Sequence, residues 1–179
     1  MDIIEALTAH HATLRHLLRA AENDPSLFDE AVKHLVVHHT MEEKYFYEIL
    51  VKLPQSRHDA LEYINEHHIV DLIINDAKSM PRDHELYAVK VEGLGEYTSH
   101  HLDEEEVEVF PAARQVLGQQ TLDELAVKFE QAKKALLGVQ VPEVDDGLVQ
   151  GDARSDGAPP ASDEQGIGLG IGSLKQTSS

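Results

Sequence analysis

Apolar residues recur at steps of three and four through the first 137 residues, the spacing typical of amphipathic helices. No stretch shows the strict alternation of a β-strand. Proline, glycine and other turn residues divide this region into helix-length segments, for which we expect bounds of about 2–22, 26–53, 56–80, 83–116 and 121–137. Four long helices joined by short connections predict an all-α, up-down-up-down four-helix bundle with a short fifth helix.

Several residues mark where these helices should begin, bend and end. Asp2 is placed to cap the first helix, Pro111 predicts a kink in the fourth, and Gly138 should end the fifth. The spacing of a capping box, a serine or threonine followed three residues later by an acidic residue, occurs at Ser26–Asp29, Ser56–Asp59 and Thr121–Glu124.

The sequence changes character near residue 138. Residues 139–179 hold many glycines and few large apolar side chains, and residues 141–179 carry seven acidic and two basic residues. Such a segment buries too little apolar surface to offset its ordering entropy, so we expect a disordered acidic tail. The predicted organisation is therefore a bundle domain at 1–138 and a tail at 139–179, which would either solubilise the protein or bind a protein partner.

Composition excludes several classes of function. The chain has 33 acidic and 15 basic residues and a formal charge of −18, which argues against nucleic-acid binding. The absence of cysteine excludes disulfides, thiolate metal sites and a cysteine nucleophile. No apolar run is long enough to span a membrane, and the N-terminus lacks the pattern of a signal peptide. We expect a cytoplasmic protein with no nucleic-acid or membrane partner.

Histidine is concentrated in the predicted bundle. All twelve histidines lie between His10 and His101, and each long helix carries one adjacent pair. Neighbouring residues on a helix point about 100° apart, so one member of a pair can face the bundle axis while the other flanks it. The four pairs are His10-His11, His38-His39, His67-His68 and His100-His101.

Heptad spacing indicates which member points inward. His11 interrupts the apolar stripe from Ile4 to Ala21, and His67 and His101 occupy the matching positions of their helices. The second helix has two stripes of similar quality, one through His38, Glu42, Tyr45 and Ile49 and the other through His39, Glu43, Phe46 and Leu50. Asp71 falls in the stripe of the third helix. Spacing alone leaves open an alternative inward set of His10, His39, Glu43, His68, His100 and Glu104.

The expected heights of these inward residues along the bundle axis agree with one another only in part. With short turns, His11 and His38 should lie at the same height, as should His67 and Glu42. His101 lies farther from the start of its helix than this pattern requires, which suggests either a longer connection after Met80 or a later helix start.

The inward residues form a potential metal site. Glu42 follows His38 by four residues and Glu105 follows His101 by four, so each pair shares a helix face. With His11 and His67 they give four imidazoles and two carboxylates, a set that suits two ions bridged by carboxylates: redox iron, or manganese or zinc in its place. Two buried carboxylates without a cation would cost several kcal/mol each, so we expect metal removal to destabilise the bundle.

Four motifs resemble the hemerythrin-like, HHE cation-binding family of four-helix bundles with a non-haem di-iron centre. They are LTAHHATLRHLL, LVVHHTMEEKYFYEIL, INEHHIVDLI and SHHLDEEEVEVFP, in order over roughly residues 1–115. The phasing of this family selects the second histidine of the first pair, His67 after Glu66, and the His-x-x-x-Glu pairs that precede Tyr47 and Phe110-Pro111. The resemblance therefore implies the metal ligands His11, His38, Glu42, His67, His101 and Glu105.

One departure bears on function. Oxygen-carrying hemerythrins place a second histidine four residues after the first on the third helix, where this chain has Asp71. An extra carboxylate would favour ferric iron, so the resemblance implies redox chemistry with dioxygen, hydrogen peroxide or nitric oxide, including a catalase-like or peroxidase-like activity. The alternatives are an iron or oxygen sensor that acts through the tail, reversible oxygen binding, and a metal-free bundle whose histidines respond to pH.

Overall fold

The structure, a computed structural model, describes residues 1–138; the predicted tail at 139–179 lies outside the described residues. This part of the chain is helical and contains no strand, as the sequence predicts. The long helices are α1 (Ile3–Asn23), α2 (Phe28–Glu42), α4 (Arg57–Lys78), α5 (Glu85–Glu104) and α7 (Gln119–Leu137). Shorter segments are η1 (Pro25–Leu27), η2 (Glu43–Tyr47), α3 (Glu48–Leu50), η3 (Glu105–Val109) and α6 (Phe110–Val116).

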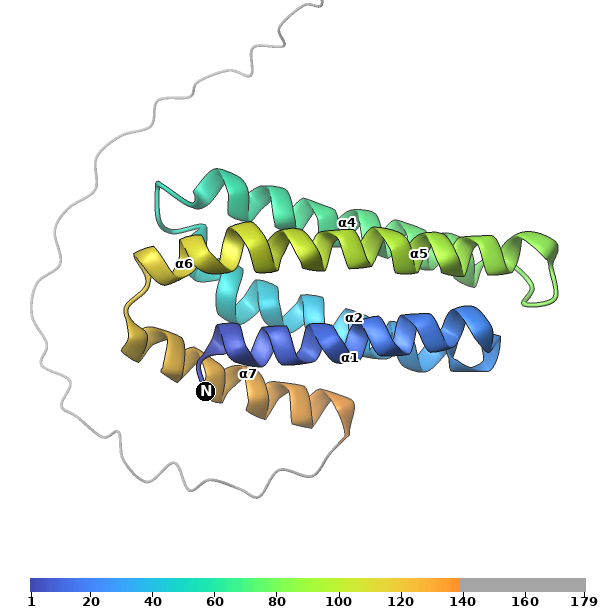
Figure 1. Cartoon of the computed structure of the whole chain (residues 1–179), viewed down its shortest axis with the longest axis horizontal. Helices are drawn as coiled ribbons and strands as arrows, with labels where there is room; N and C mark the ends of the chain where they lie inside the picture. The colour runs from blue at the N-terminus through green and yellow to red at the C-terminus, as the bar shows by residue number, and fades with distance from the viewer. Residues whose placement is uncertain (139–179) are drawn as a thin grey trace, which may run out of the picture. The chain divides into compact units, whose positions relative to one another are not determined.

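The four predicted long helices form the expected antiparallel bundle. α1 packs against α2 and α5, and α4 packs against α5, so each helix lies beside its neighbours in the chain and the last returns to the first (Figure 1). α7 is the short fifth helix, and it covers the outer face of α1 and α2. In the described residues, no helix is both long and apolar enough to cross a membrane.

The helix ends confirm some predictions and correct others. Asp2 caps α1 in a full capping box with Glu5, and Gly138 ends α7 with a positive φ of 80°. The capping boxes expected at Ser26, Ser56 and Thr121 do not form. The hydroxyl of Ser56 instead donates to the carbonyl of Leu50 at 2.8 Å, since a serine at a turn can bond to any nearby carbonyl.

The second and fourth helices each contain a π-helical turn that the sequence analysis did not predict. The turn η2 directly follows Glu42, and the turn η3 begins at Glu105. A π-turn accommodates an extra residue, so it shifts the buried stripe by one position. Tyr45 and Ile49 are therefore only half-buried, while Phe46, Tyr47 and Leu50 are buried. The second helix thus uses one predicted stripe before Glu42 and the other after it.

The third helix also corrects a prediction. Its buried stripe passes through Tyr63, His67, Val70 and Ile74, and Asp71 is exposed. Val70 and Asp71 are both about one turn from His67, and burial of the apolar side chain avoids desolvation of a carboxylate. Asp71 is therefore not part of the interior.

A longer connection after Met80 and a later start of α5 together explain why His101 lies farther along its sequence segment than the other inward residues. The connection after α4 runs from residue 79 to residue 84, and α5 begins at Glu85, two residues later than expected. The rings of His67 and His101 are consequently 4.9 Å apart.

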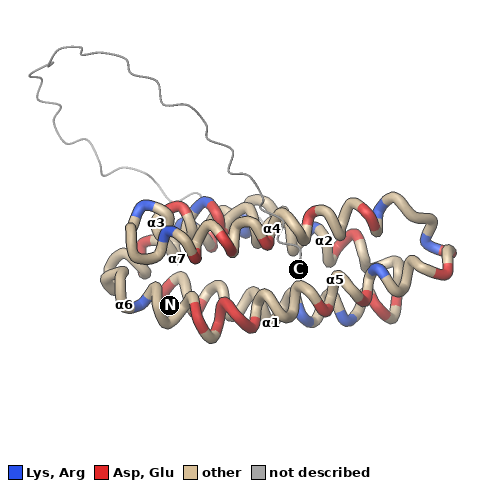
Figure 2. The backbone as a smooth tube through the Cα atoms, turned by 90° about the horizontal axis from the view of Figure 1, so that it is seen from above, with Lys and Arg blue, Asp and Glu red and all other residues tan. Residues whose placement is uncertain are grey.

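The interior consists of two apolar clusters with a polar layer between them. One cluster includes Leu7, Phe46, Phe110 and Phe129, and the other includes Leu14, Leu35 and Leu94. The polar residues between them are 0–4 % exposed although the surface carries ample charge of its own, with acidic residues along every long helix (Figure 2). A buried polar layer stabilises the fold less than apolar side chains of the same size would, so we infer that it serves a function.

Candidate metal centre

The structure brings together all six residues that the sequence analysis selected. His11, His38, Glu42 and Glu105 are 0 % exposed, and each offers a ligand atom within 4.8 Å of the others. His67 and His101, each 1 % exposed, form a second such group together with His39. The two groups lie side by side, because Glu42 and Glu105 reach towards both of them.

The distances between the two carboxylates and the imidazoles fit shared cations. Two atoms bound about 2.1 Å from one ion, at tetrahedral or octahedral angles, lie roughly 3.0–3.4 Å apart. Oε2 of Glu42 lies 3.3 Å from Nε2 of His38 and 3.6 Å from Nε2 of His67. Oε2 of Glu105 lies 3.4 Å from Nε2 of His11, and its Oε1 lies 3.3 Å from Nε2 of His101. Each carboxylate therefore lies between one histidine of each group.

The inner nitrogens are buried without a hydrogen-bond partner. Among the described residues, no hydrogen bond reaches Nε2 of His11, His38, His67 or His101, either oxygen of Glu42, or Oε2 of Glu105. Orphaned polar atoms in a protein interior are rare and costly. Converging lone pairs of imidazole and carboxylate are what a divalent cation requires, so this donor set fits iron.

The outer nitrogen of each of these histidines has a partner on the preceding helix of the ring. Nδ1 of His38 lies 3.2 Å from Nδ1 of His10 on α1, and Nδ1 of His67 lies 2.9 Å from Glu43 at the end of α2. Nδ1 of His101 lies 2.6 Å from Glu66 on α4. The ring closes where Nδ1 of His11 lies 2.9 Å from Glu106 of η3. Such outer contacts fix the orientation and tautomer of a metal-binding imidazole.

These outer partners are neighbours in the sequence of inward residues, and one of them, His10, belongs to a His-His pair. His10, Glu43, Glu66 and Glu106 each stand directly beside an inward residue, about 100° around the helix, and there they face the neighbouring helix. The sequence alone did not predict this role for them. The signal was present as a polar residue next to every inward histidine or glutamate.

His39 is the one member of the alternative inward set that joins the centre. Its ring stacks on that of His67 with centroids 3.9 Å apart, and both of its nitrogens are buried without a hydrogen-bond partner among the described residues. His68 and His100 are exposed, while Glu43 and Glu104 are half-buried. His10 is buried but lies behind His38.

A tyrosine also reaches the centre. The hydroxyl of Tyr47, which is 0 % exposed, donates to Oε1 of Glu105 at 2.6 Å. Tyr45, which the sequence analysis considered, is half-buried and has Lys44 over its ring instead. The π-turn η2 exchanges the two, because it rotates the residues after Glu42 around the helix.

The carboxylates experience strong and opposing electrostatic effects. Burial and the charge of Glu105 raise the pKa of Glu42 well above its usual value. Burial acts on Glu105 in the same direction, but the adjacent His101, with His11 and His67, lowers its pKa to about 2. Two carboxylates this close favour a single charge unless a cation lies between them. A divalent cation would allow both to ionise.

Comparison with known proteins agrees with this geometry. The family model of the hemerythrin HHE cation-binding domain matches residues 2–113. The chain belongs to the hemerythrin family. Neither a curated protein nor a solved structure matches the chain.

Hemerythrin HHE domains bind cations, typically iron, and small ligands such as oxygen, and the two histidine and glutamate groups of this chain could hold metal ions. The hemerythrin match ends at residue 113, within α6. α7 is therefore outside the matched region, although it packs directly on the two helices that carry His11 and His38.

Proposed function

We propose that the protein binds two iron ions in this centre and reacts with dioxygen or hydrogen peroxide. His11 and His38 would hold one ion and His39, His67 and His101 the other, with Glu42 and Glu105 as carboxylate ligands within reach of both groups. The observation that carries the proposal is the set of inward Nε2 atoms that have no hydrogen-bond partner among residues 1–138, each on a ring whose outer nitrogen contacts a neighbouring helix.

Iron bound here would supply electrons to a small oxidant. The surrounding residues support this use. The two apolar clusters exclude water above and below the layer. Tyr47 orients Glu105 and keeps a hydroxyl proton next to the centre; burial and the charges of Glu105 and Glu42 raise its pKa, so the proton stays in place.

His39 favours a second candidate function, reversible oxygen binding. Asp71 was expected to add a carboxylate and so to disfavour this function, but Asp71 is exposed and His39 offers a fifth nitrogen. A set richer in neutral ligands stabilises ferrous iron better than one with a third carboxylate. A sensor of iron or oxygen would pass its signal through residues 139–179, which lie outside the described part of the chain. The cytoplasmic location stays a prediction.

Iron content tests the ligand assignment. The iron-loaded chain should hold two ions, and both His38→Ala and His39→Ala should lose about one of them. His68→Ala and Asp71→Ala are matched controls, since these exposed neighbours of His67 and Val70 should leave the content at two. A chain with two ions after His39→Ala would remove His39 from the ligand set, and a wild-type chain without bound iron would overturn the proposal.

The reaction is tested on the loaded protein. Addition of hydrogen peroxide should produce oxygen faster than the same amount of free iron, and chelation should abolish the difference. Exposure to air followed by degassing distinguishes reversible oxygen binding from an irreversible reaction, because reversible binding would restore the original ferrous spectrum. If neither response exceeds that of free iron, both functions fail.

A further inference from the structure

The metal centre is buried, so a cation must reach it through one side of the bundle. On the α1 side, Glu106 is held by Arg15 at 2.9 Å, which places a positive charge next to His11. On the α2 side, α7 packs over His38, with Phe129 at 6.5 Å between ring centroids. The α4 side is different, because Glu66, the partner of His101, lines a cavity of about 330 Å³.

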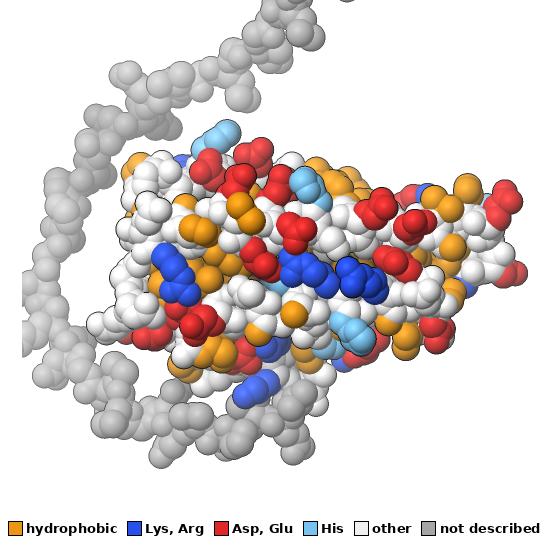
Figure 3. Space-filling view, viewed as in Figure 1, with side chains coloured by type: hydrophobic (Ala, Val, Ile, Leu, Met, Phe, Trp, Pro, Cys, Tyr) orange, Lys and Arg blue, Asp and Glu red, His pale blue; other side chains and the backbone are white. Residues whose placement is uncertain are grey.

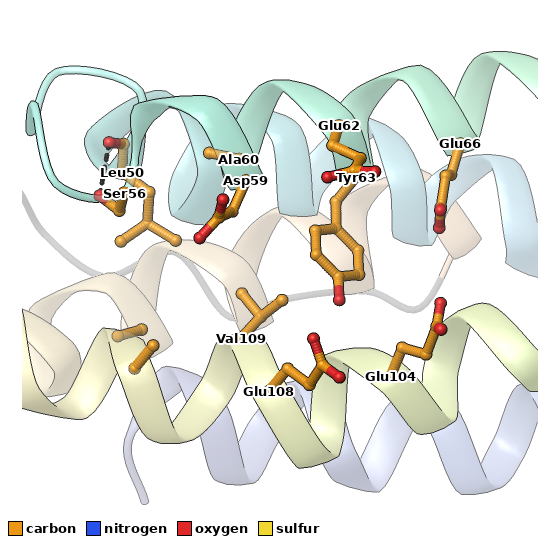
Figure 4. A pocket seen from close by; sticks show the side chains of 12 residues that line it. Leu50, Ser56, Asp59, Ala60, Glu62, Tyr63, Glu66, Glu104, Glu108 and Val109 are labelled. Atoms are coloured by element: carbon orange, nitrogen blue, oxygen red, sulfur yellow. Dashed lines mark hydrogen bonds between the residues drawn. The ribbon is translucent and has the colours of Figure 1, made fainter.

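This cavity lies between α4 and the η3–α6 segment and is strongly acidic. Its lining includes five carboxylates and no basic residue. Figure 4 shows the side chain of Glu66 pointing towards that of Glu104 across the cavity, with Glu108 farther along the same wall. Acidic side chains also gather on the surface over this part of α4 and α5 (Figure 3). The carboxylates are Asp59, Glu62, Glu66, Glu104 and Glu108.

Tyr63 provides an independent indication of a ligand. It is 8 % exposed, yet its hydroxyl points into the cavity and makes no hydrogen bond to another described residue (Figure 4). Its ring stacks on Tyr47 at 6.2 Å and lies 5.7 Å from the ring of His101. Tyr63 therefore lies between the cavity and the centre, and its hydroxyl oxygen is available to a ligand in the cavity.

We propose that this cavity is the site where a hydrated divalent iron ion docks before it enters the centre, an inference that rests on the proposed function. Carboxylates, a phenol oxygen and water suit a hard divalent cation. Glu66 joins the two places, since it faces the cavity and contacts His101.

The arrangement of the carboxylates suits transit rather than storage. Among residues 1–138, the groups whose ligand atoms converge within 4.8 Å are the two at the centre, and the cavity carboxylates form no third group. They attract a cation without enclosing it. A site on a transport route must bind strongly enough to admit an ion and weakly enough to release it.

The test is the rate of metal uptake by the metal-free full chain. Co²⁺ serves as the probe, because its visible absorption reports coordination in stopped-flow mixing. Glu104→Gln combined with Glu108→Gln should slow uptake by about tenfold, within the range of electrostatic steering, and weaken its dependence on salt. The final stoichiometry of two ions should not change, since neither residue is a proposed ligand.

A matched control separates local from overall charge. Glu85→Gln with Glu92→Gln removes the same charge from exposed positions of the same helix, away from the cavity, and should change the rate less than twofold. The single variant Glu108→Lys, at an exposed position, changes the charge of the cavity by the same two units as the double variant without burying anything new, and should slow uptake by a similar factor. Tyr63→Phe should slow it a few-fold.

The outcomes distinguish this proposal from the proposed function. If the wild type takes up no metal, the proposed function fails. If every chain takes up two ions at the same rate, or the control slows as much as the cavity variant, the docking site is wrong and the metal centre stands. Tight equilibrium binding of an organic polyamine in place of Co²⁺ would also overturn it.

Discussion

The two sides of the candidate metal centre have similar side chains but different surroundings. On the α1–α2 side, α7 covers the centre, and the ring of Phe129 lies 6.3 Å from His10 and 6.5 Å from His38. On the α4–α5 side, the acidic cavity reaches Glu66 and Tyr63. Similar ligand chemistry can therefore be closed to solvent on one side and accessible on the other, according to what packs behind the first layer of residues.

The outer contacts differ as well. His67, His101 and His11 each have a carboxylate at Nδ1, which makes an imidazole a stronger donor to a metal. His38 has the neutral His10, because burial, followed by the charge of Lys133, lowers the pKa of His10 to about 3. We therefore expect the ion on the α4–α5 side to bind to better donors and yet exchange faster.

The largest expected effect is removal of both ions. At free concentrations about 1,000 times the dissociation constant, two ions together would stabilise the fold by about 8 kcal/mol. Chelation should then lower the melting midpoint by about 20 °C or more. The release followed with a coloured chelator should have two phases, a fast one from the accessible side and a slow one from the covered side.

A variant without the buried charges provides the control. Glu42→Gln combined with Glu105→Gln should bind no metal, so chelator should leave its melting midpoint unchanged, since neither amide supplies the charge that would hold the cations. An unchanged midpoint of the wild type after chelation would contradict the centre, and a single release phase would contradict the difference between its sides.

The next effect concerns the covered side. Phe129 is 0 % exposed, so Phe129→Ala should cost about 3–5 kcal/mol and lower the midpoint by roughly 10–15 °C. It should also open the space beside His10 and His38 and bring the slow phase of release closer to the fast one. Val127→Ala, at a position on α7 that is 57 % exposed, should do neither. Slow release that survives Phe129→Ala would mean that α7 does not limit exchange.

The sequence predicted much of the fold because polar residues interrupt apolar stripes at regular steps. That periodicity selected His11, His67 and His101, the family resemblance decided for His38 over His39, and the structure places all four histidines in two adjacent groups. It failed where the helix departs from 3.6 residues per turn: the π-turn at η2 brought Tyr47 inward in place of Tyr45. A period alone cannot reveal an inserted residue.

Other parts of the site depend on tertiary contacts. Asp71 and His39 each stand at a plausible inward position, and only packing decides that Val70 displaces the first while His67 stacks on the second. The cavity is likewise invisible in the sequence, because its acidic residues come from helices that pair only in the folded chain. In the acidic run from Asp103 to Glu106, the spacing from His101 predicted Glu105 at the centre, whereas the contact of Glu106 with His11 depends on the pairing of the helices.

The smallest effect concerns the hydroxyl that joins the centre to the accessible side. Tyr47→Phe keeps the ring that stacks on Tyr63 but removes the hydrogen bond to Glu105. In the metal-free chain this should cost about 1.5–3 kcal/mol, the range for a hydrogen bond to a charged group, because Oε1 of Glu105 loses the hydrogen bond that it accepts from Tyr47. In the iron-loaded chain the cost should be smaller, since the ion compensates the same charge.

The control is Tyr45→Phe, at a half-buried position outside the centre, which should change the free energy of unfolding of neither state by more than about 0.5 kcal/mol. Equal losses with and without iron would show that the hydroxyl of Tyr47 stabilises the packing around η2 rather than the carboxylate that bridges the two sides.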